Sequence, residues 1–144
     1  MDYYVYTDGA YSTERGIGAW SFLIFTDRRF IMWKSNKSEH ISSALFAEDI
    51  AIGLACYFMN TMHLDKKDRV FIYSDSLGAV ELFSKITNNV QPRRHRNKLV
   101  QDAVDNYTTL ASNTKVSTIK VSAHKKILTP NTCTDRLAKY HLRS

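Results

Sequence analysis

Four acidic residues of this sequence stand at strand ends or in helical segments, where their carboxylates could be gathered around metal. They are Asp8, Glu48, Asp75 and Asp135. Clustered carboxylates raise one another's pKa, and Mg²⁺ prefers oxygen ligands of this kind. Two such ions about 4 Å apart can activate a water and stabilise the leaving oxygen of a phosphodiester. The chemistry to look for is therefore metal-assisted phosphodiester hydrolysis.

The segments around these acids predict how they could meet. Asp8 follows the aromatic and β-branched run Tyr3–Thr7, and Asp75 follows the apolar run Val70–Ser74. Two strands separated by a helical crossover are expected to be parallel neighbours, so both carboxylates emerge at one edge of the sheet. Glu48 lies at the edge of the apolar stripe of a helix and can lean over that edge. Asp135, in a final helix, can close the other side.

Each acid also has an ordinary interpretation. Aspartates are common in the turns that follow strands, which would account for Asp8 and Asp75. Glu48 could be a surface residue of a rotated helix, and Asp135 could interact with the helix dipole.

The remaining pattern predicts an α/β fold with a five-stranded mixed sheet flanked by helices, in one domain over residues 1–144. The expected order is βββαβααβα, opening with an antiparallel meander. After a polar turn at Ala10–Arg15 come strands within 16–25 and 30–34. A helix follows from Ser42 or Ser43 to about Met62, with Ala47, Ala51, Leu54, Ala55, Phe58 and Met62 as its buried stripe. The later elements are helices at 76–86 and up to about 111, a strand at 115–121 with Ile119 and Val121 inward, and a helix at 131–141. Trp20 and Trp33 are expected in the core.

Composition limits the possible partners and compartments. The 144 residues carry a net charge of +6, which suits a polyanion but also fits an ordinary basic protein. Four basic residues gather after the second helix and could contact phosphates or form a solvated face: Arg93, Arg94, Arg96 and Lys98. No apolar run approaches the roughly 18 residues that span a bilayer, and no signal peptide is evident. The two cysteines form no disulfide or metal pattern, so we expect a reducing compartment. Together these features predict an intracellular, cytoplasmic protein without membrane association, and a nuclear or viral context stays open.

Four segments bear on a known family: Thr7-Asp8-Gly9-Ala10 with Gly16-x-Gly18-x-Trp20, Ser43-Ala44-x-x-Ala47-Glu48-x-x-Ala51, Ser74-Asp75-Ser76, and His124 with Asn131-x-x-x-Asp135-x-Leu137-Ala138. In order and spacing they resemble the four motifs of type 1 ribonuclease H. The second segment is most similar to the retroviral and retroelement form of the family. The resemblance extends over essentially the whole chain.

The resemblance implies a ribonuclease H-like fold and an endonuclease that hydrolyses the RNA strand of RNA–DNA hybrids, leaving a 5′-phosphate and a 3′-hydroxyl. Asp8, Glu48, Asp75 and Asp135 would be the metal ligands and would hold two Mg²⁺ ions, with Mn²⁺ as an alternative. His124 would assist turnover and product release. Ser43 would help to hold a phosphate of the DNA strand, and backbone groups around Gly9 would contact the ribose. A monomer without an organic cofactor is expected.

The sequence also departs from the family. Asn or Gln often precedes the glutamate by three and four residues and reads the minor groove, whereas this chain has Leu45 and Ala44. The histidine loop, Ala123–Leu128, is stiffer and more basic, and the segment Arg93–Lys98 is expected to replace a longer basic protrusion. Two alternatives remain open at this stage. One is a structure-specific DNA nuclease of the same superfold, such as a junction resolvase or a transposase-like enzyme, and the other is a non-catalytic nucleic-acid-binding domain.

Overall fold

The structure, a computed structural model, describes residues 1–27 and 29–122. Its elements are β1 (Asp2–Ser12), β2 (Ile17–Thr26), β3 (Phe30–Ser38), α1 (Ala44–Asn60), β4 (Arg69–Ser74), α2 (Leu77–Thr87), α3 (Lys98–Asn113) and β5 (Lys115–Lys120). The strands form one mixed sheet in the order β3-β2-β1-β4-β5. The expected meander and the parallel pairing of β1 with β4 are both confirmed. No helix in these two ranges is long and apolar enough to cross a membrane. The expected final helix lies outside the described residues.

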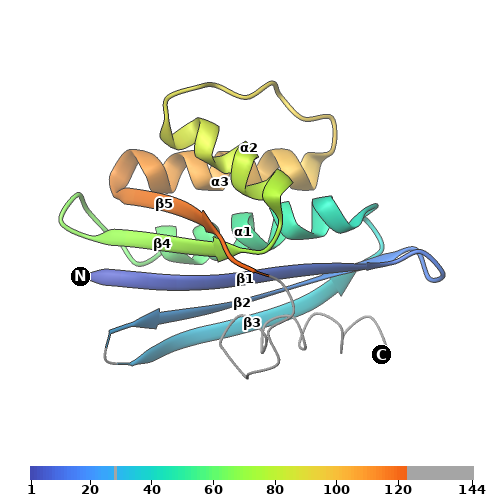
Figure 1. The fold of residues 1–144 in the computed structure, drawn as a ribbon, viewed down its shortest axis with the longest axis horizontal. Coiled ribbons are helices and arrows are strands. Elements are labelled where there is room, and N and C mark those ends of the chain that lie inside the picture. The colour runs from blue at the N-terminus through green and yellow to red at the C-terminus, as the bar shows by residue number, and fades with distance from the viewer. Residues whose placement is uncertain (28, 123–144) are drawn as a thin grey trace.

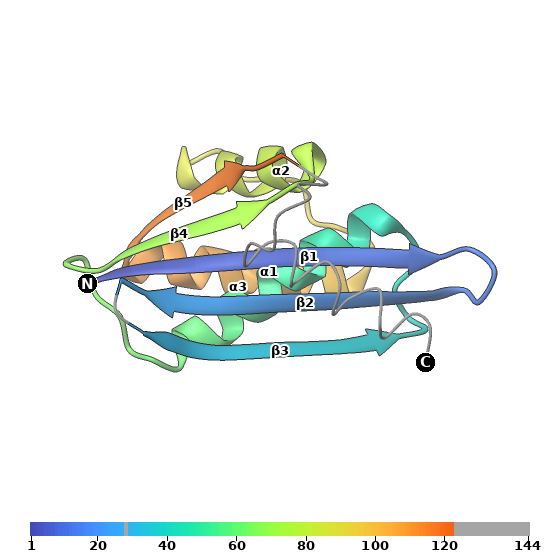
Figure 2. The same cartoon turned by 60° about the horizontal axis from the view of Figure 1, so that its bottom comes forward.

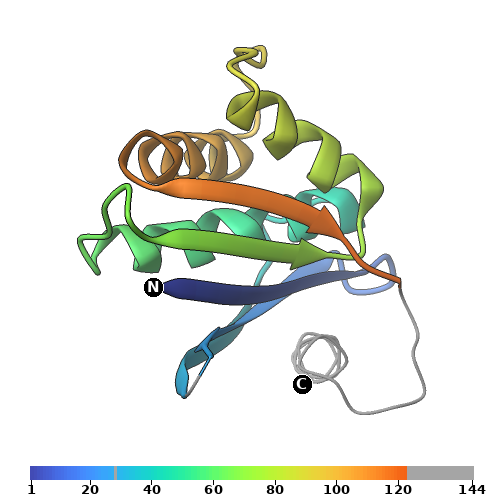
Figure 3. The same cartoon turned by 60° about the vertical axis from the view of Figure 1, so that its left-hand side comes forward.

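The three helices α1, α2 and α3 all cover the same face of the sheet (Figures 1 and 3). The residues of β1 that point toward them are buried: Tyr3, Val5 and Thr7. Tyr4, Tyr6 and Asp8 alternate with these and share the opposite face, as the sequence predicts. On that face Tyr4 stacks on Phe71 at 5.7 Å and Tyr6 stacks on Tyr73 at 4.8 Å between ring centroids. Figure 2 looks onto this face of the sheet, with the helices behind it.

The first strand is longer than the sequence predicts. Instead of turning at Ala10, β1 continues to Ser12, because residues 10–12 pair with residues 17–19 of β2. The turn is then made by residues 13–16, where Gly16 has a φ of 64° and donates its N–H to the Ser12 carbonyl at 2.9 Å. The pairing with β4 nevertheless stops at Tyr6. Among residues 1–27 and 29–122, the strand beyond Tyr6 pairs only with β2, and its other edge has no strand partner at Asp8.

Helix α1 begins at the predicted N-cap, since the Ser43 hydroxyl accepts the Phe46 N–H at 3.1 Å. Its predicted buried stripe is only partly correct. The three alanines are buried, whereas Leu54, Phe58 and Met62 are half-buried. Three residues outside the predicted stripe are fully buried: Ile52, Cys56 and Met59. The stripe is displaced because α1 packs on both the sheet and α3.

Two further core predictions are wrong. On β5 the inward residues are Val116 and Thr118, not Ile119 and Val121, and Thr118 meets the buried Tyr107 hydroxyl at 2.7 Å. Ile119 is instead 37% exposed. Trp33 is 51% exposed, because β3 is an edge strand of the described sheet and α1, α2 and α3 all cover the opposite face.

Helices α1 and α3 touch at a glycine. A Cβ on Gly53 would lie 2.2 Å from the Cβ and 2.3 Å from the Cα of Ala103, so any side chain there must push the helices apart. We predict that Gly53→Ala lowers the free energy of unfolding by about 1–3 kcal/mol, despite the better helix propensity of alanine. Chemical denaturation followed by circular dichroism measures this change.

Gly78→Ala is the matched control, because a Cβ at position 78 meets only the flexible end of Leu45, at 2.9 Å. That variant should match the wild type or gain up to about 1 kcal/mol. Equal losses in the two variants would show that backbone proximity at Gly53 is not the cause.

Candidate metal centre

Three of the four predicted acids lie together in the structure. Asp8 from β1, Glu48 from α1 and Asp75 from the residue after β4 offer carboxylate oxygens that all lie within 4.8 Å of one another. Asp8 is 2% exposed and Glu48 is 8% exposed, while Asp75 is half-buried. The fourth acid, Asp135, lies outside the described residues, as does His124.

Asp8 reaches the cluster because of where the strand pairing ends. The parallel pairing of β1 with β4 covers Asp2 to Tyr6, and β4 itself ends at Ser74. Asp8 and Asp75 therefore both emerge just past the last paired residues, at the edge where α/β sheets place ligands. The Gly9 N–H donates to the Asp8 Oδ1 at 3.0 Å and fixes that carboxylate.

Glu48 reaches the same point because Gly9 has no side chain. A Cβ on Gly9 would lie 2.3 Å from the carbonyl carbon of Ala47 and 2.4 Å from the nitrogen of Glu48. Real Cβ atoms do not approach backbone this closely, so α1 lies directly on β1 only with glycine here. The sequence predicts Gly9 as a nucleic-acid contact, but its steric role requires the structure.

Ser74 is a neighbour of the cluster that the sequence analysis did not single out. Its fully buried hydroxyl accepts the Ser76 N–H at 3.2 Å, and its Oγ lies 3.5 Å from the Glu48 Oε2. Since Ser76 occupies a lone pair, the hydroxyl hydrogen is directed at Glu48. The only signal in the sequence is a serine before the aspartate, which does not reveal a partner 26 residues away.

The electrostatics of the carboxylate cluster favour a bound cation. The pKa of Glu48 is raised to about 8, first by burial and then by the charge of Asp75, while hydrogen bonds with Asp8 and the Gly9 backbone act in the opposite direction. Ionised carboxylates buried this way are stabilised by a cation. The donor set consists of oxygens only, which suits Mg²⁺ or Mn²⁺. The three residues therefore fit a divalent metal.

A second buried acid follows Glu48 directly. Asp49 is 3% exposed, and burial raises its pKa to about 7. Its Oδ1 has no hydrogen-bond partner among the described residues, and it does not belong to the carboxylate cluster. Asp49 is thus buried like Glu48 but has no place in the metal centre.

The predicted nucleic-acid contacts differ in the partners of their side chains. Ser43 caps α1, five residues before Glu48. Arg93, Arg94 and Arg96 are exposed in the connection from α2 to α3. Lys98, in contrast, is paired with Asp102 at 3.1 Å, which makes it a weaker candidate for a phosphate contact.

Comparison with known proteins gives a consistent result. The family model described as RNase H matches residues 1–143. The N-terminal RNase H domain of a Mycobacterium tuberculosis protein, solved as a fusion with maltose-binding protein, has a similar structure. It is 16% identical with a TM-score of 0.75, covering 99% of this chain and 94% of that chain. RNase H1 from the archaeon Halobacterium salinarum is also 16% identical, with a TM-score of 0.69, covering 99% and 98%. A search among curated protein sequences gives no match.

The raised pKa of Glu48 predicts how stability depends on pH without metal. The folded protein keeps this proton up to about pH 8, whereas an ordinary glutamate loses it near 4.5. Between these values the folded state binds more protons than the unfolded state, so the free energy of unfolding falls as pH rises. We expect a loss on the order of a few kcal/mol across the range, and Glu48→Gln should reduce it. Thermal melts at both ends of the range measure the effect.

Asp49→Asn is the control, since it should also reduce the pH dependence through the same burial effect. Addition of Mg²⁺ should then separate the two variants, stabilising the wild type and Asp49→Asn but not Glu48→Gln. Equal stabilisation of all three proteins would contradict a metal site at Glu48.

Proposed function

Because the chain belongs to the ribonuclease H family, we propose that its buried carboxylates hold the divalent metal with which it hydrolyses the RNA strand of RNA–DNA hybrids. The protein is an endoribonuclease acting on such hybrids, and the family uses divalent metal. The observation that supports the assignment of residues is the cluster of Asp8, Glu48 and Asp75 within 4.8 Å. Two bound Mg²⁺ ions, with Mn²⁺ as an alternative, are the proposed cofactors.

The metal, when bound, supplies an activated water and stabilises the leaving 3′-oxygen of the RNA strand. Asp8 and Asp75, just past the paired residues of β1 and β4, and Glu48 on α1 would hold the metal. Glu48 would serve as a ligand in its ionised form, since a carboxylic acid is a poor ligand. The products proposed are a 5′-phosphate and a 3′-hydroxyl.

Other parts of the proposal rest on the sequence. Asp135 is the proposed fourth ligand, and His124 is the proposed aid to turnover and product release. Ser43 at the start of α1 is proposed to bind a phosphate of the DNA strand, and the Gly9 backbone to contact the ribose, whose 2′-hydroxyl distinguishes RNA from DNA. We also propose that the enzyme is cytoplasmic and monomeric, that it consists of one domain, and that it uses no organic cofactor.

A cleavage assay on labelled RNA–DNA hybrid tests the proposed ligands. Asp8→Asn and Asp75→Asn should each reduce Mg²⁺-dependent cleavage by more than about 100-fold, because even residues that only support metal ligands cost 10–100-fold. Both variants should remain folded, since losing one of several repelling acids relieves strain.

Glu81→Gln, a change to an exposed acid of α2, is the control and should cleave like the wild type. Duplex DNA, double-stranded RNA and a four-way DNA junction serve as competing substrates. Retention of hybrid cleavage by Asp75→Asn would refute its role, and faster cutting of the junction would refute the hybrid specificity.

A further inference from the structure

Residues 88–97 form an arch that joins α2 to α3 (Figure 1). The arch contains three exposed arginines, Arg93, Arg94 and Arg96, and no acidic residue. None of the three has an ion-pair partner among the described residues. Arginine binds phosphate oxygens through two parallel hydrogen bonds, so the arch has the chemistry to bind a nucleic-acid strand.

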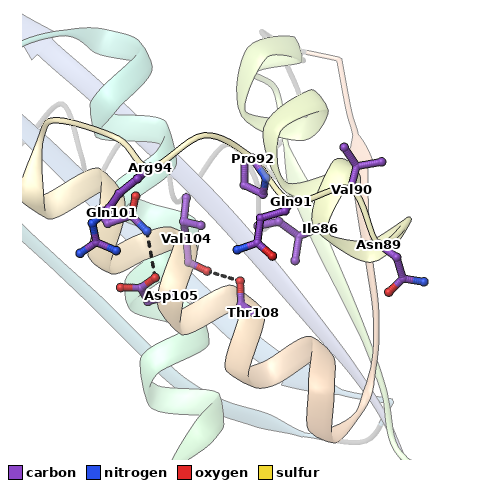
Figure 4. A pocket seen from close by; sticks show the side chains of 10 residues that line it. All are labelled: Ile86, Asn89, Val90, Gln91, Pro92, Arg94, Gln101, Val104, Asp105 and Thr108. Carbon is purple, nitrogen blue, oxygen red and sulfur yellow. Dashed lines mark hydrogen bonds between the residues drawn. The ribbon is translucent and has the colours of Figure 1, made fainter.

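A pocket of about 530 Å³ separates the arch from the outer side of α3. In Figure 4 the arch supplies one wall, with Gln91 and Pro92, and α3 supplies the other, with Gln101 and Asp105. The arch is therefore not packed on α3 along its length. What fixes its position must lie at its ends.

The end nearest α3 is fixed by His95. The His95 ring meets the ring of Phe46 edge-on, with centroids 5.0 Å apart and an interplanar angle of 86°. Phe46 lies in the first turn of α1, two residues before Glu48. Edge-on aromatic pairs of this kind are stabilising beyond their buried area. His95 thus connects the basic arch to the helix that carries a metal ligand.

Hydrogen bonds hold His95 in place. The backbone N–H of His95 donates to the Gln101 Oε1 at 2.6 Å. The Nδ1 of the His95 ring accepts the backbone N–H of Asn97 at 2.9 Å. Gln101 is buried and donates its own amide to Asp105 at 2.9 Å, a bond drawn in Figure 4, which fixes the orientation of the amide group. Asn97 in turn caps α3 through the Leu99 N–H at 3.0 Å. These bonds fix the backbone of the arch at His95 and Asn97, beside Arg94 and Arg96.

We propose that His95 is a positioning residue that holds the arginines of the arch at a fixed place relative to the carboxylates, so that they contact a phosphate backbone of the bound hybrid. This inference rests on the proposed function. Successive phosphates lie at set spacings from the scissile bond, and phosphate contacts fix the register of a protein on a duplex. A basic segment held at a fixed position therefore meets the same phosphates in every complex. Without the contact with Phe46, the arginines keep their charge but lose their position.

The alternative is that His95 serves only the N-terminal cap of α3. The two roles differ in what a variant changes. Loss of a cap lowers stability alone, whereas loss of positioning weakens substrate binding and reduces the number of phosphate contacts.

The test uses His95→Ala, His95→Phe and His95→Asn. Phenylalanine keeps a ring against Phe46 but no acceptor, and asparagine keeps an acceptor but no ring. For each variant, KM and kcat on labelled hybrid are measured over a range of salt concentrations, together with Mg²⁺ binding by calorimetry. We expect His95→Ala to raise KM by about 3–10-fold and to lower the salt slope of binding by about one per lost phosphate contact. It should leave kcat and Mg²⁺ affinity within about twofold, and the other two variants should be intermediate.

Two further variants complete the experiment. Tyr107→Phe removes hydrogen bonds to Thr87, the last residue of α2, and to Thr118, but leaves the contacts of His95 in place, and so controls for lost stability. Replacing the three arginines of the arch by glutamine should reduce the salt slope at least as much as His95→Ala. An unchanged KM and salt slope in His95→Ala, or a Tyr107→Phe enzyme with the same rise in KM, would overturn the positioning role. Failure of the proposed function would appear differently, as a wild-type protein without Mg²⁺-dependent hybrid cleavage.

Discussion

Helix α1 can lie on β1 only because position 9 has no side chain, and the rest of the site depends on that contact. The backbone of Ala47 and Glu48 occupies the space where a Cβ on Gly9 would be. On its other side α1 meets α3 through Gly53, again with no room for a methyl group. The helix is thus held from two sides by backbone proximity. Close packing on both sides leaves the helix little room to move, so it fixes the position of the Glu48 carboxylate at the edge of the sheet.

The site is assembled against its own electrostatics. Three carboxylates are brought within 4.8 Å, and the pKa of Glu48 rises to about 8 chiefly because it is buried. At neutral pH the metal-free protein therefore carries a proton where the metal would bind. Proton and metal compete for Glu48, so metal affinity is coupled to pH. The aromatic stacks of the far face and the apolar core beneath α1 offset the cost of holding these acids together.

Much of this arrangement follows from sequence patterns, but its exact contacts do not. The proximity of Asp8 and Asp75 is predictable, because two apolar strands separated by a helix favour parallel neighbours. The inward face of β5 is not, since its single alternation allows either Val116 or Ile119 to point inward, and only packing against Tyr107 decides. Contacts such as that of His95 with Phe46 join residues far apart in the chain. No local preference of either residue type indicates them.

β4 pairs with β1 although α1 and two strands separate them in the sequence, and this separation affects the order of folding. The meander β1–β3 is built from local hairpins, whereas β1 pairs with β4 only after residues 2–6 meet residues 69–73. Closing so long a loop costs entropy before any contact repays it, so this pairing is expected to form after the hairpins. Asp75 enters with β4. The repelling carboxylates are therefore expected to meet only as Val70 and Ile72 of β4 join the hydrophobic core.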